Sequence, residues 1–254
     1  MKNSEYNFYQ NVKNWDFSMI KRESELLTNW DMYDVLNENA NEKSVVLDLG
    51  TGGGEKVLKY FPKVKEIVAT DYSEEMINTA EKNLADSFRK SENIKFKVMD
   101  NMDMSVPENY FDIVVARHTI IDAVQIHKSL KDGGLLILRG VDKLDCWQLK
   151  RLFGRGQAYQ DNKPISLIDY ENILAAGFKD VELIPIHERE YYKSKDDLLA
   201  LLHKTPILDN MSVDDNEYDR LEIDEIKLHE YITKNTYDKG ILLIRRYYGI
   251  TARK

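Results

Sequence analysis

The segment VVLDLGTGGG, residues 45–54, decides the fold class of this 254-residue chain. Its first part, Val45–Leu49, is aliphatic except for Asp48, a composition typical of a buried strand. Four glycines follow within the next five positions, where a backbone can turn tightly and approach a ligand closely. An ordinary tight turn is the alternative interpretation. The density of glycines directly after an aliphatic run favours a ligand-binding turn.

Short aliphatic runs continue to alternate with longer amphipathic segments as far as residue 184, which indicates β-α-β units and a mostly parallel sheet. Helices are expected over Glu55–Tyr60, ended by Pro62, and after Ser73, whose hydroxyl can cap the first turn. The sequence therefore predicts an α/β fold. The expected strands are Val45–Leu49, Glu66–Thr70, Ile94–Val98, Phe111–Ala116, Gly134–Arg139 and Val181–Pro185, with a last strand over Ile241–Thr251.

We expect a single domain with an elaborated cap. Residues 1–43 form a helical N-terminal arm, 44–193 the core, 194–238 a helical insertion, and 239–254 a terminal strand of the core. In the insertion, Ser194 is expected to cap a helix that Pro206 ends, and a second helix is expected from Asn216 to Lys234. Arm and insertion together can roof a site. The aromatic residues of the arm can line that pocket or simply pack between helices: Tyr6, Tyr9, Trp15, Phe17 and Trp30.

Composition narrows the classes of function. With 36 basic and 44 acidic residues the net charge is −8, which disfavours binding to phosphate backbones. The single cysteine, Cys146, excludes an internal disulfide, and the histidines show no metal-ligand spacing, so no metal is predicted. A polar N-terminus and the lack of a long apolar run predict a cytoplasmic protein with no signal peptide and no membrane span. Both a monomer and a homodimer stay open.

Two acidic residues accompany the glycine turn. Asp71 ends the next expected strand, 23 residues beyond Asp48, a distance typical of a carboxylate that accepts ribose hydroxyls. A solvated loop residue or a helix cap is the alternative for Asp71. Asp100 follows the third strand, where a carboxylate can accept a hydrogen bond from the exocyclic amine of adenine, and the nearby Asp103 competes for this role.

Other nucleotide-binding turns fit less well. The dinucleotide fingerprint G-x-G-x-x-G, started at Gly50, requires a glycine at position 55, and this chain has Glu55. The Glu55 carboxylate would also repel a pyrophosphate at the start of the following helix. A P-loop is excluded because no Lys-Ser or Lys-Thr follows the glycines.

Taken in order, these features resemble the successive motifs of the class I S-adenosylmethionine-dependent methyltransferases. The resemblance covers residues 45–184 and includes FDIVV at 111–115 and LKDGGL at 130–135, where Asp132 stands in place of a frequent proline. It implies S-adenosyl-L-methionine as the cofactor. It also implies a Rossmann-like, seven-stranded sheet whose last strand is antiparallel and lies between the fifth and sixth. It places Asp48, Gly50, Thr51, Gly52 and Gly54 at the methionine side of the cofactor, Asp71 at the ribose, and Asp100, Asn101 and Met102 at the adenine. Tyr72 and Met102 are candidates to pack on the two adenine faces, with ordinary packing at the edge of the core as the alternative. The predicted cofactor-binding set also includes Met76, Ala116 and Arg117.

The acceptor is expected beyond the carboxyl ends of the first and fourth strands, and the fourth strand leads into Arg117 and His118. A sulfonium methyl donor is already activated, so alignment and exclusion of water can suffice without a base. His118 is the candidate general base, with a histidine that only packs at a strand end as the alternative. Arg117 can anchor a carboxylate of the cofactor or substrate, or pair with a nearby acid.

The sequence thus predicts methyl transfer to an O or N atom of a small molecule. A tRNA or rRNA methyltransferase is an alternative that the acidic charge disfavours. A non-catalytic regulator that binds S-adenosylmethionine is a third. The glycines in Leu152–Tyr159 indicate either a movable lid or the end of a helix.

Overall fold

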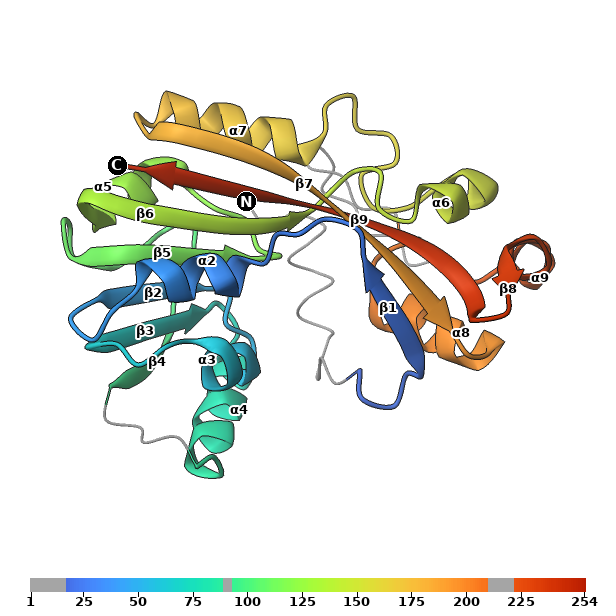
Figure 1. Ribbon diagram of the computed structural model, residues 1–254, viewed down its shortest axis with the longest axis horizontal. Coiled ribbons are helices and arrows are strands. Elements are labelled where there is room, and N and C mark those ends of the chain that lie inside the picture. The colour runs from blue at the N-terminus through green and yellow to red at the C-terminus, as the bar shows by residue number, and fades with distance from the viewer. Residues whose placement is uncertain (1–16, 89–92, 210–221) are drawn as a thin grey trace. The chain divides into compact units, whose positions relative to one another are not determined.

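The computed structural model describes residues 17–88, 93–209 and 222–254, which divide into two compact units (Figure 1). The first unit comprises the chain up to Asn29 together with Val141–Ile165 and Pro185–Tyr247. The second comprises Trp30–Gly140, Ser166–Ile184 and Tyr248–Lys254. The expected core range of 44–193 is therefore interrupted, since residues 141–165 and 185–193 belong to the first unit.

The sheet of the second unit confirms the predicted α/β fold. The seven expected strands lie in the order β4-β3-β2-β5-β6-β9-β7, and β2 runs parallel to both β3 and β5. Two further strands, Arg22–Leu26 and Thr236–Tyr237, pair with β7 and β9, so the described sheet has nine strands and the expected count of seven is wrong. The last strand is antiparallel to β6, because the Gly133 amide donates to the Lys254 carbonyl and the Lys254 amide donates to the Gly134 carbonyl. The strands are β2 (Val45–Leu49), β3 (Glu66–Asp71), β4 (Ile94–Val98), β5 (Phe111–Arg117), β6 (Leu130–Val141), β7 (Lys179–Tyr192) and β9 (Gly240–Arg253).

Helices cover this sheet because their apolar sides face it. Met32 and Leu36 of α2 and Val57 of α3 are buried in one cluster with Val46 and Ile113 of the central strands. The Ser73 hydroxyl accepts a hydrogen bond from the Met76 amide at 3.3 Å, which confirms the predicted cap. The helices are α2 (Met32–Asn39), α3 (Glu55–Tyr60), α4 (Glu74–Ala85), α5 (Ala123–Ser129) and α7 (Ile165–Ala175).

The first unit contains the expected helices of the insertion. The helix α8 (Lys195–Lys204) begins at the Ser194 cap, and α9 (Glu225–Asn235) begins later than predicted, the span from 216 to 221 being outside the described residues. The helix α6 (Trp147–Phe153) ends at Gly154 in a left-handed conformation, so the helix-end interpretation of that glycine is confirmed. The strands of this unit are β1 (Arg22–Leu26), β8 (Thr236–Tyr237) and the adjoining parts of β7 and β9.

The prediction of a wholly helical arm over residues 1–43 is wrong for its middle part. Arg22–Leu26 forms strand β1, which pairs antiparallel with β7, while α2 follows at Met32–Asn39. Residues 1–16 lie outside the described residues, and with them Tyr6, Tyr9 and Trp15. β1 carries charged side chains suited to an edge strand, and only the hydrogen bonds offered by β7 make it extended.

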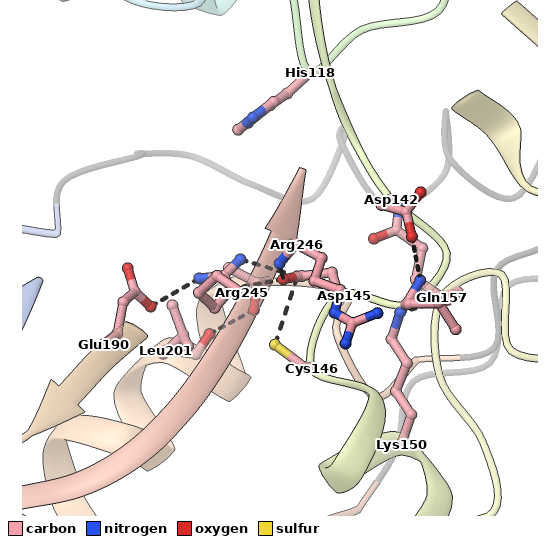
Figure 2. A network of polar contacts seen from close by, with 12 residues as sticks. His118, Asp142, Asp145, Cys146, Lys150, Gln157, Glu190, Leu201, Arg245 and Arg246 are labelled. Atoms are coloured by element: carbon pink, nitrogen blue, oxygen red, sulfur yellow. Dashed lines mark hydrogen bonds and ion pairs between the residues drawn. The ribbon is translucent and has the colours of Figure 1, made fainter. Parts of the chain in front are cut away.

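A buried network of ion pairs links three segments of the first unit. Figure 2 shows the Arg245 guanidinium between the carboxylates of Glu190 and Asp145, with the Cys146 sulfur beside Asp145. Arg245 Nε donates to Asp145 Oδ1 at 2.9 Å and Nη1 donates to Glu190 Oε2 at 3.0 Å. All three side chains are buried, and the Tyr192 hydroxyl adds a 2.5 Å hydrogen bond to Glu190. The network ties β9 to β7 and to the segment before α6.

Among the described residues, no helix is both long enough and apolar enough to cross a membrane. In the same part of the chain, His, Cys, Asp and Glu side chains form no group of three or more that could hold a metal ion.

Candidate active site

The glycine turn joins β2 to α3 in the second unit. The amides of Gly50 and Thr51 both donate to the Thr70 carbonyl, at 2.9 and 2.8 Å, so the turn is held against the end of β3. Gly52 has φ +57°, and a Cβ atom built on it would meet nothing within 4 Å. Gly54 has φ +75° and precedes the first residue of α3. The turn thus presents open backbone at Gly52, which is what close approach of a ligand requires.

Asp71 is fixed by this turn. It is buried at the end of β3, where its Oδ2 atom accepts from the Gly52 amide at 2.9 Å and its Oδ1 atom accepts from the Ser73 amide at 3.0 Å. Burial raises the pKa of the carboxyl above its usual range, although the backbone amides oppose the rise. The carboxylate therefore stands beside the open face of Gly52, where a ribose is expected.

Asp48 is a second buried carboxylate at the same turn, with 6% of its surface exposed. Burial raises its pKa to about 7, the Asp71 charge adds to the rise, and Arg117 opposes it. Two neighbouring buried carboxylates repel each other and lose hydration, and an added positive charge relieves both penalties. The pair therefore fits a cationic ligand, such as one that carries sulfonium and ammonium groups.

The adenine end of the predicted site differs in detail from expectation. Asn101 is buried and donates to Thr119 Oγ1 at 2.9 Å, while its own Oδ1 atom is buried without a hydrogen-bond partner among the described residues. Asp100 is exposed, and its Oδ1 atom accepts from the Met102 amide at 2.8 Å. An unsatisfied buried amide oxygen is suited to accept from an exocyclic amine, so Asn101 joins Asp100 as a candidate for that contact.

The end of β5 lies against the glycine turn. A Cβ atom built on Gly50 would come within 2.8 Å of Thr119 Cβ, so this position admits only glycine at the present spacing. Arg117, the last residue of β5, pairs in register with Arg139 of β6. His118 follows with φ +52°, a conformation that non-glycine residues rarely adopt and that is concentrated at functional sites.

The contact between His118 and Arg139 bears on the predicted general base. His118 Nε2 lies 2.8 Å from Arg139 Nη1, and a guanidinium can only donate, so Nε2 is the acceptor and the ring proton is assigned to Nδ1. The Nε2 lone pair that would take a proton from a substrate is thus engaged by Arg139. This geometry favours a positioning role for His118, and its role as a base stays a prediction.

Other predicted residues lie on the same elements. Tyr72 follows Asp71, Met76 is buried in the first turn of α4, and Ala116 is buried in β5. Phe17 packs against the core of the first unit, whereas Trp30 packs against the core of the second. For these two aromatic residues the structure therefore supports the packing interpretation.

Sequence reasoning missed Tyr33 and Arg139 as members of this cluster. Burial raises the pKa of the Tyr33 phenol, with Arg117 and Arg139 opposing the rise and Asp48 adding to it, so all four groups interact. Arg139 had a signal, since it ends a predicted strand whose carboxyl end lies at the ligand-binding edge of a parallel sheet. For Tyr33, the sequence contained no signal beyond its place in a segment rich in aromatic residues.

Comparisons with known proteins point to one class of protein. Residues 46–134 match the family model described as a methyltransferase domain. A ubiquinone/menaquinone biosynthesis C-methyltransferase of Rickettsia prowazekii is 24% identical over 172 residues, which span 65% of this chain and 68% of the relative. Its counterpart in Rickettsia bellii is 26% identical over 125 residues, which span 47% of this chain and 50% of the relative. In fold, the chain is similar to a candidate methyltransferase of Bacillus halodurans, with a TM-score of 0.59 at 17% identity, covering 88% of this chain and 98% of the other.

Fold, turn and family match agree on the class: residues 46–134 match a methyltransferase domain, and together these findings support a class I S-adenosylmethionine-dependent methyltransferase that uses S-adenosylmethionine as its cofactor. Within that class, the curated relatives reported above are named as methyltransferases of quinone biosynthesis, and the chain spans two thirds of one and half of the other. The residues at the turn fit the cofactor, because the backbone of Gly52 is open to a ligand and a positive charge would stabilise the buried carboxylates of Asp48 and Asp71.

Proposed function

We propose that this chain transfers the methyl group of S-adenosylmethionine to an O or N atom of a small molecule. The observation that carries the proposal is the pair of buried carboxylates, Asp48 and Asp71, beside the open backbone of Gly52. They can hold the charged methionine end and the ribose of the cofactor. The methyl group is then presented to an acceptor aligned by the ends of β5 and β6, with no obligatory base.

A carbon acceptor is the second candidate, because the curated relatives reported above are named as C-methyltransferases. A small molecule is favoured over RNA by the net charge of −8. The single, buried Cys146 suits a reducing compartment, so a cytoplasmic location belongs to the same proposal.

The test supplies the purified chain with S-adenosylmethionine carrying an isotope-labelled methyl group and a fractionated metabolite extract. We expect S-adenosylhomocysteine and a labelled product whose methyl chemical shift distinguishes O, N and C acceptors. A parallel reaction with bulk tRNA tests the nucleic-acid alternative. Cofactor binding without any S-adenosylhomocysteine would show a pure binding protein and contradict the proposal.

Asp71→Ala provides the site-directed arm of this test. Loss of the carboxylate should weaken S-adenosylmethionine binding by about 1 to 3 kcal/mol in calorimetry, the usual cost of losing hydrogen bonds to a charged group. Because Asp71 also holds the Gly52 and Ser73 amides, thermal melting must show that the variant is folded. Unchanged affinity would contradict the ribose assignment.

A further inference from the structure

The proposed function leaves open which ligand Arg117, at the end of β5, contacts. Arg117 is half-buried and forms no ion pair or side-chain hydrogen bond within the described part of the chain. A half-buried guanidinium with no bonded partner forgoes several charge-assisted hydrogen bonds, each stronger than a neutral one. Such a group at the ligand-binding edge of the sheet is therefore a candidate for contact with a ligand.

The surroundings of Arg117 add positive charge. Arg139 stands at the same level of the neighbouring strand β6, and His118 engages one of its terminal nitrogens. On α3, the Lys56 ammonium packs over the Tyr60 ring at 5.2 Å and lies within electrostatic reach of both arginines. The three cations therefore lie within electrostatic reach of one another at the edge of the sheet that carries the glycine turn.

The buried acid nearby does not neutralise this charge once the cofactor binds. Asp48 is the carboxylate whose charge acts on Arg117, and a bound cationic cofactor favours its ionised form. Asp48 is proposed to bind the cofactor, which itself carries one net positive charge. Cofactor binding therefore leaves an excess of positive charge at the end of β5, and an anion would balance it.

We propose that the methyl acceptor is an anion whose carboxylate or phosphate group is bound by the Arg117 guanidinium. This inference rests on the proposed function and narrows its substrate class. A guanidinium can bind two oxygens of such a group at once, which fixes the orientation of the acceptor as well as its position. The Tyr33 hydroxyl, which is protonated at neutral pH and interacts electrostatically with Arg117 and Arg139, is a further candidate donor.

The first experiment measures binding of inorganic phosphate by calorimetry to the full chain saturated with S-adenosylmethionine, at constant ionic strength. We expect saturable binding that Arg117→Gln weakens by at least about tenfold, as for loss of a charge-assisted pair. Lys63→Gln is the matched control, because it removes an exposed cation from the same unit and should leave binding unchanged. Absence of saturable binding, or equal binding by Arg117→Gln, would overturn the inference.

The second experiment separates the acceptor from the cofactor's own carboxylate. S-adenosylmethionine affinity should stay within about twofold in Arg117→Gln, whereas a loss of about tenfold would assign Arg117 to the cofactor and overturn the inference. Arg117→Lys retains the positive charge but cannot bind two oxygens in the bidentate manner of a guanidinium, so it should bind phosphate better than Arg117→Gln. It also keeps the test decisive if the neutral variant does not fold.

The third experiment divides the metabolite extract on an anion exchanger before the methyl-transfer assay. Methylated product in the retained fraction supports the inference, whereas product confined to the unretained fraction overturns it and upholds the proposed function. No product in either fraction counts against the proposed function, and the phosphate titration then decides the inference by itself.

Discussion

Cofactor binding should depend on pH through Asp48. Burial raises the pKa of this carboxyl to about 7, and a cationic ligand binds its ionised form. About 3% of the groups are ionised at pH 5.5 and about half at pH 7.0, so the affinity for S-adenosylmethionine should rise about fifteenfold, or about 1.6 kcal/mol, over that interval. The amine of the ligand stays protonated throughout, since α-amino groups titrate near pH 8.

Calorimetry in buffers of different ionisation enthalpy measures both consequences. Binding at pH 5.5 should release close to one proton, and Asp48→Asn should bind more weakly at pH 7.0 with neither the pH slope nor the proton release. If wild type released no proton, or if Asp48→Asn kept the full slope, Asp48 would not be the titrating group.

The same pKa has a consequence for stability. Because folding raises the pKa of Asp48 from 3.8 to about 7, the ligand-free native state binds a proton that the unfolded state has lost, and stability falls as pH rises from about 4 to 7. The loss is at most about 4 kcal/mol. Asp48→Asn should therefore melt at a higher temperature than wild type above pH 7 without ligand, although it binds the cofactor less well. A lower melting temperature under those conditions would contradict the shift.

Further substitutions at Gly54, Gly52, His118 and Arg245 test the site and the core. Gly54→Ala places a methyl group 2.8 Å from Phe96 Cζ at φ +75°, so it should cost about 2 kcal/mol or more in urea unfolding. Gly52→Ala meets open space and carries only the backbone strain of φ +57°, about 1 kcal/mol, so it should destabilise less and weaken cofactor binding. His118→Ala should lower kcat by about tenfold or less if His118 only positions Arg139; a loss of about 100-fold with unchanged cofactor affinity would show a general base. Arg245→Met strands two buried carboxylates and should destabilise the chain by about 3 to 5 kcal/mol, whereas the control Arg246→Met should cost much less; equal losses would show that the network contributes nothing special.

The sequence by itself determined the elements whose signals are local. The aliphatic run Val45–Leu49 and the glycines after it produced β2 and the turn, because burial on both faces and left-handed backbone each demand particular residue types. Ser73 and Ser194 cap their helices as predicted, since a capping hydroxyl needs only the next three residues. The placement of Asp71 at a strand end followed from the same alternation of strands and helices.

Only the tertiary structure decided features that depend on distant partners or on burial. Arg22–Leu26 is a strand because it pairs with the edge of β7. Arg245 binds Asp145, which lies 100 residues away in the sequence. The pKa of Asp48 and the engagement of His118 by Arg139 likewise arise from groups brought together by folding. Local sequence encodes backbone preference, whereas desolvation and charge interactions depend on distances that exist only once the sheet has assembled.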